Sequence, residues 1–140
     1  LKPDMPGYTS EEIKMRNETW KILGTRRIKV CATTVRVPVF YGHSEVLNIE
    51  FRRPVSPEEA RAVLEKTAGV KICDDLANAR YPMPIDVAGK DDVLVGRIRV
   101  DESVKKGLVL FVAGDNIRKG AALNAVQIAE VMIQRNLLRK

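Results

Sequence analysis

The segment from Arg36 to Ser44, which reads Arg-Val-Pro-Val-Phe-Tyr-Gly-His-Ser, combines residue types that could do chemistry. It contains the only histidine of the chain, His43, seven positions after Arg36. A guanidinium donates hydrogen bonds in a rigid fork that fits a carboxylate or a phosphate. An imidazole takes up and releases a proton near neutral pH, which suits general acid-base catalysis. The segment is therefore a candidate site, with a cation and an acid-base group for an anionic substrate.

Both residues also have a simpler structural interpretation. A histidine beside a glycine is often a turn residue, and an arginine on a strand is often a solvated charge. Perturbed or paired groups are only probabilistic markers of function. The residue types by themselves leave both interpretations open.

Two predicted strands flank this candidate site. Val, Ile and Thr are frequent from Ile28 to Val39, which predicts a strand, and Pro38 places its end at a sheet edge or a bulge. Apolar and polar residues alternate from Glu45 to Phe51, which predicts a second, half-buried strand. His43 is then expected in the loop between two strands, where loops commonly carry function.

A helix is predicted to begin after Thr9. Thr9 and Glu12 have the spacing of a capping box, and the helix should continue to about Leu23. Glu11 and Lys14 are three residues apart, so they share a face of its first turn. By spacing alone they fit an ordinary surface pair of opposite charges.

A second helix is predicted to begin after Ser56 and to end near Thr67. Pro57 occupies the favoured first position, and Glu59 completes a capping box. Three further strands are predicted, and a long connection separates the first from the second: Val70–Cys73, connection 74–92, Val93–Val100 and Leu108–Val112. These elements predict the α+β class, with helices layered on a mixed, largely antiparallel sheet.

The last predicted helix is the longest element. Apolar residues recur at helical spacing from about Lys119 to Leu138, and Asp115 and Asn116 precede them. The start of a helix presents backbone N–H groups and a positive dipole end to anything that docks there. The alternative interpretation of these two residues is structural: Asp115 or Asn116 simply caps the helix.

Composition limits the class of protein. With 140 residues, of which 45% are hydrophobic and 30% charged, the chain is expected to form one globular unit with a real core. The net charge of +6 suits an anionic partner. The basic residues are scattered and only 5% of residues are aromatic, so nucleic-acid binding is not expected. A phosphorylated small molecule fits the charge equally well.

Cysteine usage and apolar runs give further expectations. Cys31 and Cys73 are too few and too isolated for a disulfide framework or a zinc site, so no metal is expected and a reducing cytoplasm is the default location. No apolar run approaches the roughly 20 residues that span a bilayer, and no signal peptide opens the chain. No glycine-rich dinucleotide motif is present. The first residues lack a starting Met and include two prolines, so we expect a piece of something longer.

Four segments together make the chain recognisable. They are Gly-Tyr-Thr-Ser-Glu-Glu-Ile-Lys from Gly7, Arg-Val-Pro-Val-Phe-Tyr-Gly-His-Ser-Glu from Arg36, Val-Gly-Arg-Ile-Arg from Val95, and Asp-Asn-Ile-Arg-Lys-Gly-Ala-Ala-Leu-Asn-Ala-Val-Gln-Ile-Ala-Glu from Asp115. In this order they resemble bacterial aspartate-semialdehyde dehydrogenases, from about Gly7 to the end. The resemblance implies that residues 1–140 are the later part of that family's catalytic and dimerisation domain, which has a glyceraldehyde-3-phosphate dehydrogenase-like fold and forms homodimers. The helix at about 119–138 would return to a nucleotide-binding domain.

The resemblance also implies an activity and a role for each candidate residue. The family uses NADPH to convert aspartyl-4-phosphate into aspartate semialdehyde and phosphate, a step in amino-acid biosynthesis toward lysine, threonine and methionine. By this resemblance His43 is the acid-base catalyst, and Arg36 holds the substrate carboxylate. Glu11 meets the substrate amino group, and Lys14 meets the phosphate. Asn116 contacts the NADP cofactor.

The chain departs from the family pattern in two respects. The nucleophilic cysteine and the glycine-rich cofactor loop of the family lie in segments ahead of this one, and neither Cys31 nor Cys73 has the matching context. Without a thiolate there is no thioester and no acceptor for hydride, so the chain alone is expected to be inactive. An inactive dimerisation or substrate-pocket module, or a catalytically silent paralogue, stays open as the alternative. Bare apolar surface and strand edges would favour association or aggregation.

Overall fold

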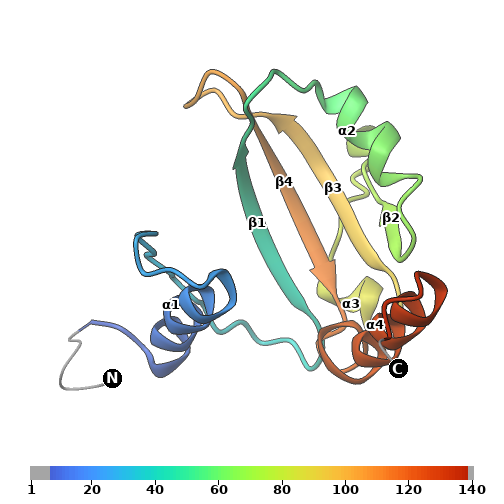
Figure 1. Ribbon diagram of the computed structural model, residues 1–140. Coiled ribbons are helices and arrows are strands. Elements are labelled where there is room, and N and C mark those ends of the chain that lie inside the picture. Colours follow the sequence, from blue (N-terminus) through green and yellow to red (C-terminus); the bar gives the residue numbers. More distant parts are fainter. Residues whose placement is uncertain (1–6, 139–140) are drawn as a thin grey trace. The chain divides into compact units, whose positions relative to one another are not determined.

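The computed structural model describes residues 7–138, which divide into two compact units (Figure 1). The first unit ends at Pro38 and the second begins at Val39. Each unit has its own secondary structure. Composition alone predicts one globular unit, whereas the structure has two, and residues 25–42 between the first helix and the first strand contain no regular element.

Helix α1, Ser10–Leu23, forms where its capping residues predict it. The Thr9 hydroxyl accepts a hydrogen bond from the Glu12 backbone N–H at 3.3 Å, and the Glu12 carboxylate accepts one from the Thr9 N–H at 2.7 Å. The helix ends at Gly24, whose φ of 63° lies in the left-handed region that glycine adopts without a steric penalty. Both predicted ends of this helix are confirmed.

The predicted strand from Ile28 to Val39 is wrong. Residues 25–42 contain neither helix nor strand, and Val35 and Val37 are 77% and 57% exposed. Val and Ile favour strands because they pack well on a half-buried pleated surface, but this preference forms a strand only where a partner strand pairs with the segment, and none does among residues 7–138. Since Pro38 also lacks a backbone N–H, it cannot donate to a ladder. His43 therefore does not lie between two strands.

A four-stranded mixed sheet forms the centre of the second unit (Figure 1). Its spatial order is β1 (His43–Glu50), β4 (Gly107–Gly114), β3 (Val93–Val100) and β2 (Val70–Ile72). The pairs β1–β4 and β4–β3 are antiparallel, and β2 is parallel to β3. This confirms the predicted α+β class with a mixed, largely antiparallel sheet.

Strand β1 starts two residues earlier than predicted and is less buried. The prediction began at Glu45, whereas the strand begins at His43. Along the strand only Ile49 is partly buried, and Val46 is 59% exposed. The strand lies at the edge of the sheet, so one neighbour, β4, covers it. Apolar and polar residues do alternate along β1. Among the described residues, however, no layer of side chains buries the apolar face that such an alternation normally indicates.

Helix α2, Pro57–Leu64, lies beside β3 and β2 (Figure 1). It begins at the predicted cap, Ser56, and ends before Thr67 because the chain tightens into turns after Leu64. Ala60 and Leu64 pack against the buried centre of the sheet. That centre consists of Val95, Ile98 and Leu110. The apolar face of a single short helix therefore closes this part of the sheet.

The connection between β2 and β3 is folded rather than open. It contains a 3-10 helix, Leu76–Asn78, and a short helix α3, Pro84–Val87. Pro82 and Val87 are fully buried. Two prolines in one connection predict a bend, and the structure uses them to bring α3 beside the sheet near β4.

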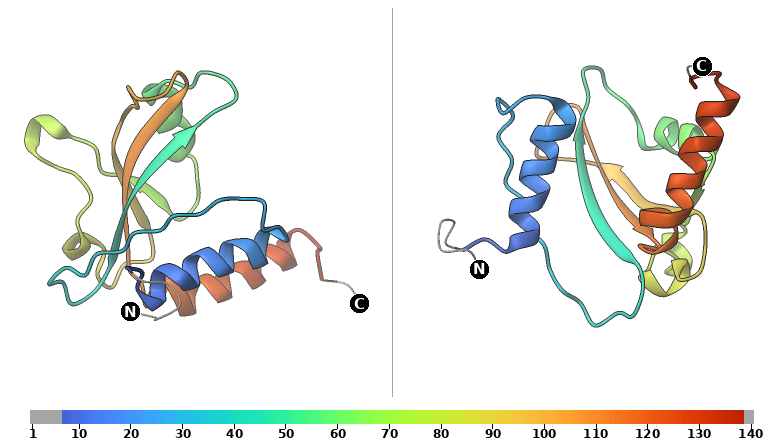
Figure 2. Two further views of the ribbon diagram at one scale, coloured as in Figure 1. Left: turned by 90° about the vertical axis from the view of Figure 1, so that its left-hand side faces the viewer. Right: turned by 60° about the horizontal axis from the view of Figure 1, so that its bottom comes forward.

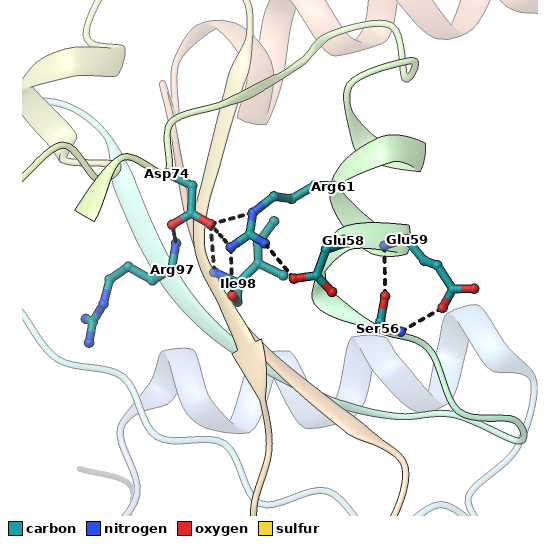
Figure 3. Close-up of polar contacts among 7 residues, drawn as sticks. All are labelled: Ser56, Glu58, Glu59, Arg61, Asp74, Arg97 and Ile98. Carbon is teal, nitrogen blue, oxygen red and sulfur yellow. Dashed lines mark hydrogen bonds and ion pairs between the residues drawn. The ribbon is translucent and has the colours of Figure 1, made fainter. Parts of the chain in front are cut away.

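Asp74 fixes an irregularity in β3 at Arg97, where the pairing with β4 shifts register (Figure 3). Arg97 has a φ of 52°, which a non-glycine residue rarely adopts. The Asp74 carboxylate accepts hydrogen bonds from the backbone N–H groups of Arg97 at 2.6 Å and Ile98 at 3.3 Å. It also accepts two from the Arg61 guanidinium, at 3.0 and 2.6 Å. A buried carboxylate thus satisfies the backbone groups that a bulge leaves unpaired.

The last helix is shorter than predicted. A π-helical segment, Arg118–Ala122, leads into α4, Leu123–Gln134, which extends away from the end of β4 (Figure 2). Asn136 has a φ of 52°, a left-handed conformation that ends helices, so the helix does not continue to Leu138. Several apolar side chains of α4 are exposed: Val126, Ile128, Val131 and Ile133. Within residues 7–138, no helix has the length and apolar character needed to cross a membrane.

Candidate functional site

Glu11 and Lys14 lie on one face of the first turn of α1, as predicted. The Lys14 Nζ donates a hydrogen bond to the Glu11 Oε1 at 3.4 Å, and the two side chains are 57% and 51% exposed. An exposed ion pair of this kind contributes little to stability. Both side chains can therefore exchange this contact for a ligand at small cost.

Glu12, next to Glu11, has a structural task in the same unit. It is buried, and its carboxylate accepts backbone hydrogen bonds from Thr9 and, at 2.8 Å, from Thr34. These hydrogen bonds, Thr9 first, hold the pKa of Glu12 below its usual range. The bond to Thr34 ties the segment before Arg36 to the start of α1. The Arg36 side chain is exposed and makes no ion pair among the described residues.

His43 is the first residue of β1 and lies opposite Gly114 of β4. His43 is exposed, whereas the preceding Gly42 is buried. Gly42 has a φ of 92°, and a Cβ at this position would lie 3.2 Å from the Pro84 carbonyl oxygen. Only glycine combines this backbone conformation with so close an approach. Gly42 therefore sets the path by which the chain enters β1 and presents the imidazole.

Asn116 contacts the residue just before His43. Its Oδ1 accepts a hydrogen bond from the Gly42 backbone N–H at 2.9 Å, across 74 positions of sequence. Among the residues that the structure describes, its amide nitrogen donates no hydrogen bond. Asn116 is therefore not a simple helix cap. Asp115 is the residue that accepts hydrogen bonds at the entry to the helical segment, where its Oδ1 accepts from the backbone N–H groups of Ile117 and Arg118 at 2.8 and 2.9 Å.

Asp115 anchors this corner of the second unit. It is 4% exposed, and its Oδ2 also accepts a hydrogen bond from the Gly89 backbone N–H at 2.7 Å. The backbone hydrogen bonds, from Arg118 first and then from Gly89, hold the pKa of Asp115 below its usual range. The carboxylate thus joins the end of β4, the start of the last helix and the turn after α3.

We expect Asp115 to make stability sensitive to acid. A lowered pKa in the folded state means that the ionised carboxylate stabilises the fold above the unfolded-state pKa of about 3.9, and that this contribution disappears as the pH falls through the lower folded-state pKa. Asp115→Asn removes the titrating group. Urea unfolding at a series of pH values from about 5 downward should show a steeper loss of stability for the natural protein than for the variant. Parallel curves would contradict this role.

The five predicted site residues fall into the two units. Glu11, Lys14 and Arg36 belong to the first, and His43 and Asn116 to the second. The proximity of Glu11 and Lys14 follows from helical spacing and could be predicted. The contact of Asn116 with Gly42 could not, because nothing in the local sequence links two segments so far apart.

A family model for the semialdehyde dehydrogenase dimerisation domain matches residues 2–119. This chain belongs to that family. Members of known sequence include aspartate-semialdehyde dehydrogenases from Aquifex aeolicus, 54% identical over 132 residues, and from Prochlorococcus marinus, 55% identical over 129. The alignments cover 94% and 92% of this chain but 39% and 38% of those proteins. The chain therefore spans well under half the length of its curated relatives.

Solved structures show the same domain. The chain is similar to the crystal structure of aspartate semialdehyde dehydrogenase II from Vibrio cholerae, with a TM-score of 0.77 and 48% identity over 93% of this chain and 38% of that one. A probable aspartate-semialdehyde dehydrogenase from Pseudomonas aeruginosa has a TM-score of 0.76 at 30% identity, over 95% of this chain and 39% of that one. The family resemblance and the fold predicted from the sequence are both confirmed.

Proposed function

We propose that this chain is the later part of the catalytic and dimerisation domain of an NADPH-dependent aspartate-semialdehyde dehydrogenase. The observation that carries the proposal is identity above 50% to enzymes of that name over more than nine-tenths of this chain. The proposed reaction converts aspartyl-4-phosphate into aspartate semialdehyde and phosphate. The nicotinamide cofactor, when bound, supplies the hydride for this reduction.

The proposed substrate would account for the presence of Arg36, Glu11 and Lys14 in this chain. A phosphorylated amino acid has a carboxylate, an ammonium group and a phosphate. Its binding site therefore requires a cationic side chain for each of the two anionic groups and a carboxylate side chain for the ammonium group. Arg36 would bind the carboxylate through its two-pronged guanidinium, Glu11 the ammonium group, and Lys14 the phosphate. The exposure of all three side chains supports this assignment, because none is committed to a buried structural contact.

His43 would be the acid-base residue of the reaction. The imidazole is exposed at the start of β1, and the preceding Gly42 packs closely against Pro84, which sets the path of the backbone there. Such an imidazole can accept a proton from a nucleophile and return it to the substrate oxygen. The nucleophile itself would be a cysteine from a segment other than this chain. Cys31 and Cys73 are not proposed for that task, since neither has the family's sequence context around it.

Asn116 is the residue of this chain that we assign to a contact with the cofactor. Its amide nitrogen, which donates no hydrogen bond among residues 7–138, is a suitable donor to an NADP carbonyl or hydroxyl oxygen. The main cofactor site would lie in a nucleotide-binding domain. The exposed apolar side chains of α4 support the proposal that this helix returns to that domain, since burying them there would remove apolar surface from water.

A homodimer in the cytoplasm completes the proposal. The matched family model describes a dimerisation domain, and two such domains from identical chains would make a symmetric interface. The two cysteines are free rather than paired, which fits a reducing compartment.

The decisive experiment is an assay of the complete gene product that contains this chain. Its intact mass is compared with that of the chain, 15.7 kDa, and its activity is followed as NADP-dependent, phosphate-requiring oxidation of aspartate semialdehyde. We expect a mass more than about twice that of the chain, together with activity. A heavy, folded but inactive protein would refute the enzyme assignment. It would favour the alternative, an inactive dimerisation or substrate-pocket module.

Arg36→Ala is expected to raise the KM for aspartate semialdehyde by about tenfold to a hundredfold, because the bidentate pair with the substrate carboxylate is lost. Arg36→Lys should recover only part of the loss, since an ammonium group cannot form the same fork. Arg27→Ala is the matched control, since Arg27 is also exposed and lies in the same irregular segment. Equal KM values for the Arg36 and Arg27 variants would refute the assignment.

A further inference from the structure

We propose that Asn116 is a positioning residue for His43, which it holds in place through the Gly42 backbone. The inference rests on the proposed function, because the task of His43 belongs to that proposal. The observation behind it is the hydrogen bond from the Gly42 N–H to the Asn116 Oδ1, at 2.9 Å. The bond holds the backbone of Gly42, the residue directly before the one that carries the imidazole.

The backbone around His43 is held from three directions. On the strand side, His43 is in register with Gly114. On the α3 side, Gly42 lies so close to Pro84 that a Cβ at this position would be 3.2 Å from the Pro84 carbonyl oxygen, a tight contact. The third constraint is the bond to Asn116. Because Gly42 is buried, its N–H would lack a partner without the Asn116 oxygen, so the chain entering β1 would shift toward another acceptor or toward water.

The backbone of Asn116 is itself held in place, so its side chain can determine the position of Gly42. It comes two residues after Gly114, which pairs with His43, and directly after the buried Asp115. The Asp115 carboxylate joins the turn at Gly89 to the start of the last helix. The backbone of Asn116 therefore continues directly from a buried anchor, and its side chain holds the residue before the imidazole through one hydrogen bond. A displacement of about 1 Å in a catalytic group can cost about a hundredfold in rate, so holding the imidazole in place has catalytic value.

The positioning task and a cofactor contact use different atoms of Asn116. Positioning needs the side-chain oxygen as an acceptor, which the structure shows in use. A contact with the cofactor would use the amide nitrogen as a donor. Aspartate has nearly the same shape, keeps the acceptor and loses the donor. Asn116→Asp therefore separates the two tasks, which Asn116→Ala removes together.

The test compares kcat and both KM values of the complete gene product with those of Asn116→Ala and Asn116→Asp. We expect Asn116→Ala to lower kcat by about tenfold and to leave the KM for aspartate semialdehyde within about twofold, since the imidazole is displaced while the substrate-binding side chains are untouched. Asn116→Asp should restore kcat to within about threefold of the natural value. Asn78→Ala is the matched control, because it also removes a side-chain hydrogen bond of an asparagine, to Asp75 in the 3-10 helix, and should leave kcat unchanged.

Three results would overturn the inference. The first is an unchanged kcat in Asn116→Ala. The second is a rise in the KM for NADP without a fall in kcat, which would assign Asn116 to the cofactor alone. The third is an Asn116→Asp variant as slow as the alanine variant. If Asn116→Ala does not fold, as judged by circular dichroism, Asn116→Ser replaces it, because its side chain is polar but too short to take over the contact. An inactive natural protein would instead refute the proposed function, so the two failures are distinguishable.

Discussion

Replacing His43 by alanine in the complete gene product is expected to lower kcat by about a hundredfold to ten-thousandfold, the range that a lost general acid-base group costs. His43 is the only histidine of this chain, so one substitution removes every imidazole that the chain can offer. The measurement is the NADP-dependent oxidation of aspartate semialdehyde. Added imidazole should recover part of the rate in the variant if the missing group is a proton carrier.

Stability separates this effect from a general loss of structure. The His43 side chain is exposed, and no hydrogen bond of its imidazole is found in the described part of the chain. His43→Ala should therefore unfold at nearly the same urea concentration as the natural protein. Ser44→Ala, at the next position of β1, is the matched control for activity. A His43 variant that retains most of its kcat would show that the imidazole does not transfer the proton.

Replacing Asp74 by alanine is expected to lower the free energy of unfolding by about 3 to 5 kcal/mol, as breaking a buried ion pair does. The Asp74 side chain is 1% exposed and the Arg61 side chain 32%. Without the carboxylate, the guanidinium is left half-buried beside the core, and the backbone N–H groups of Arg97 and Ile98 lose their acceptor. The unusual backbone conformation of Arg97 would then have no support (Figure 3).

Urea unfolding of the natural protein and of two aspartate variants tests this expectation. The matched control is Asp91→Ala, which removes a carboxylate that pairs with Arg118 on the surface, where both side chains are about half exposed. Exposed pairs contribute little, so the control should change stability far less than Asp74→Ala. Similar losses for the two variants would mean that the hydrogen bonds of Asp74 do not support β3.

Local chemistry explains what was predictable in the fold. The starts of α1 and α2 follow from capping boxes that act within four residues, so no distant contact is required to form them. The apolar runs of β3 and β4 predict strands, and both are inner strands of the sheet, with a neighbouring strand on each side. The predicted strand at 28–39 failed because strand formation requires a neighbouring strand, which residue composition cannot supply.

The sequence by itself determined the family, the class of fold and the residue types of the candidate site. Helical periodicity determined that Glu11 and Lys14 are neighbours, because a fixed rotation per residue sets that distance. Tertiary structure decided that His43 begins an edge strand, that Asp74 supports a distorted strand, and that Asn116 contacts Gly42 rather than capping a helix. The reason is physical: these three arrangements depend on hydrogen bonds between segments far apart in the chain, and only the packing of the sheet and its connections brings such segments within reach.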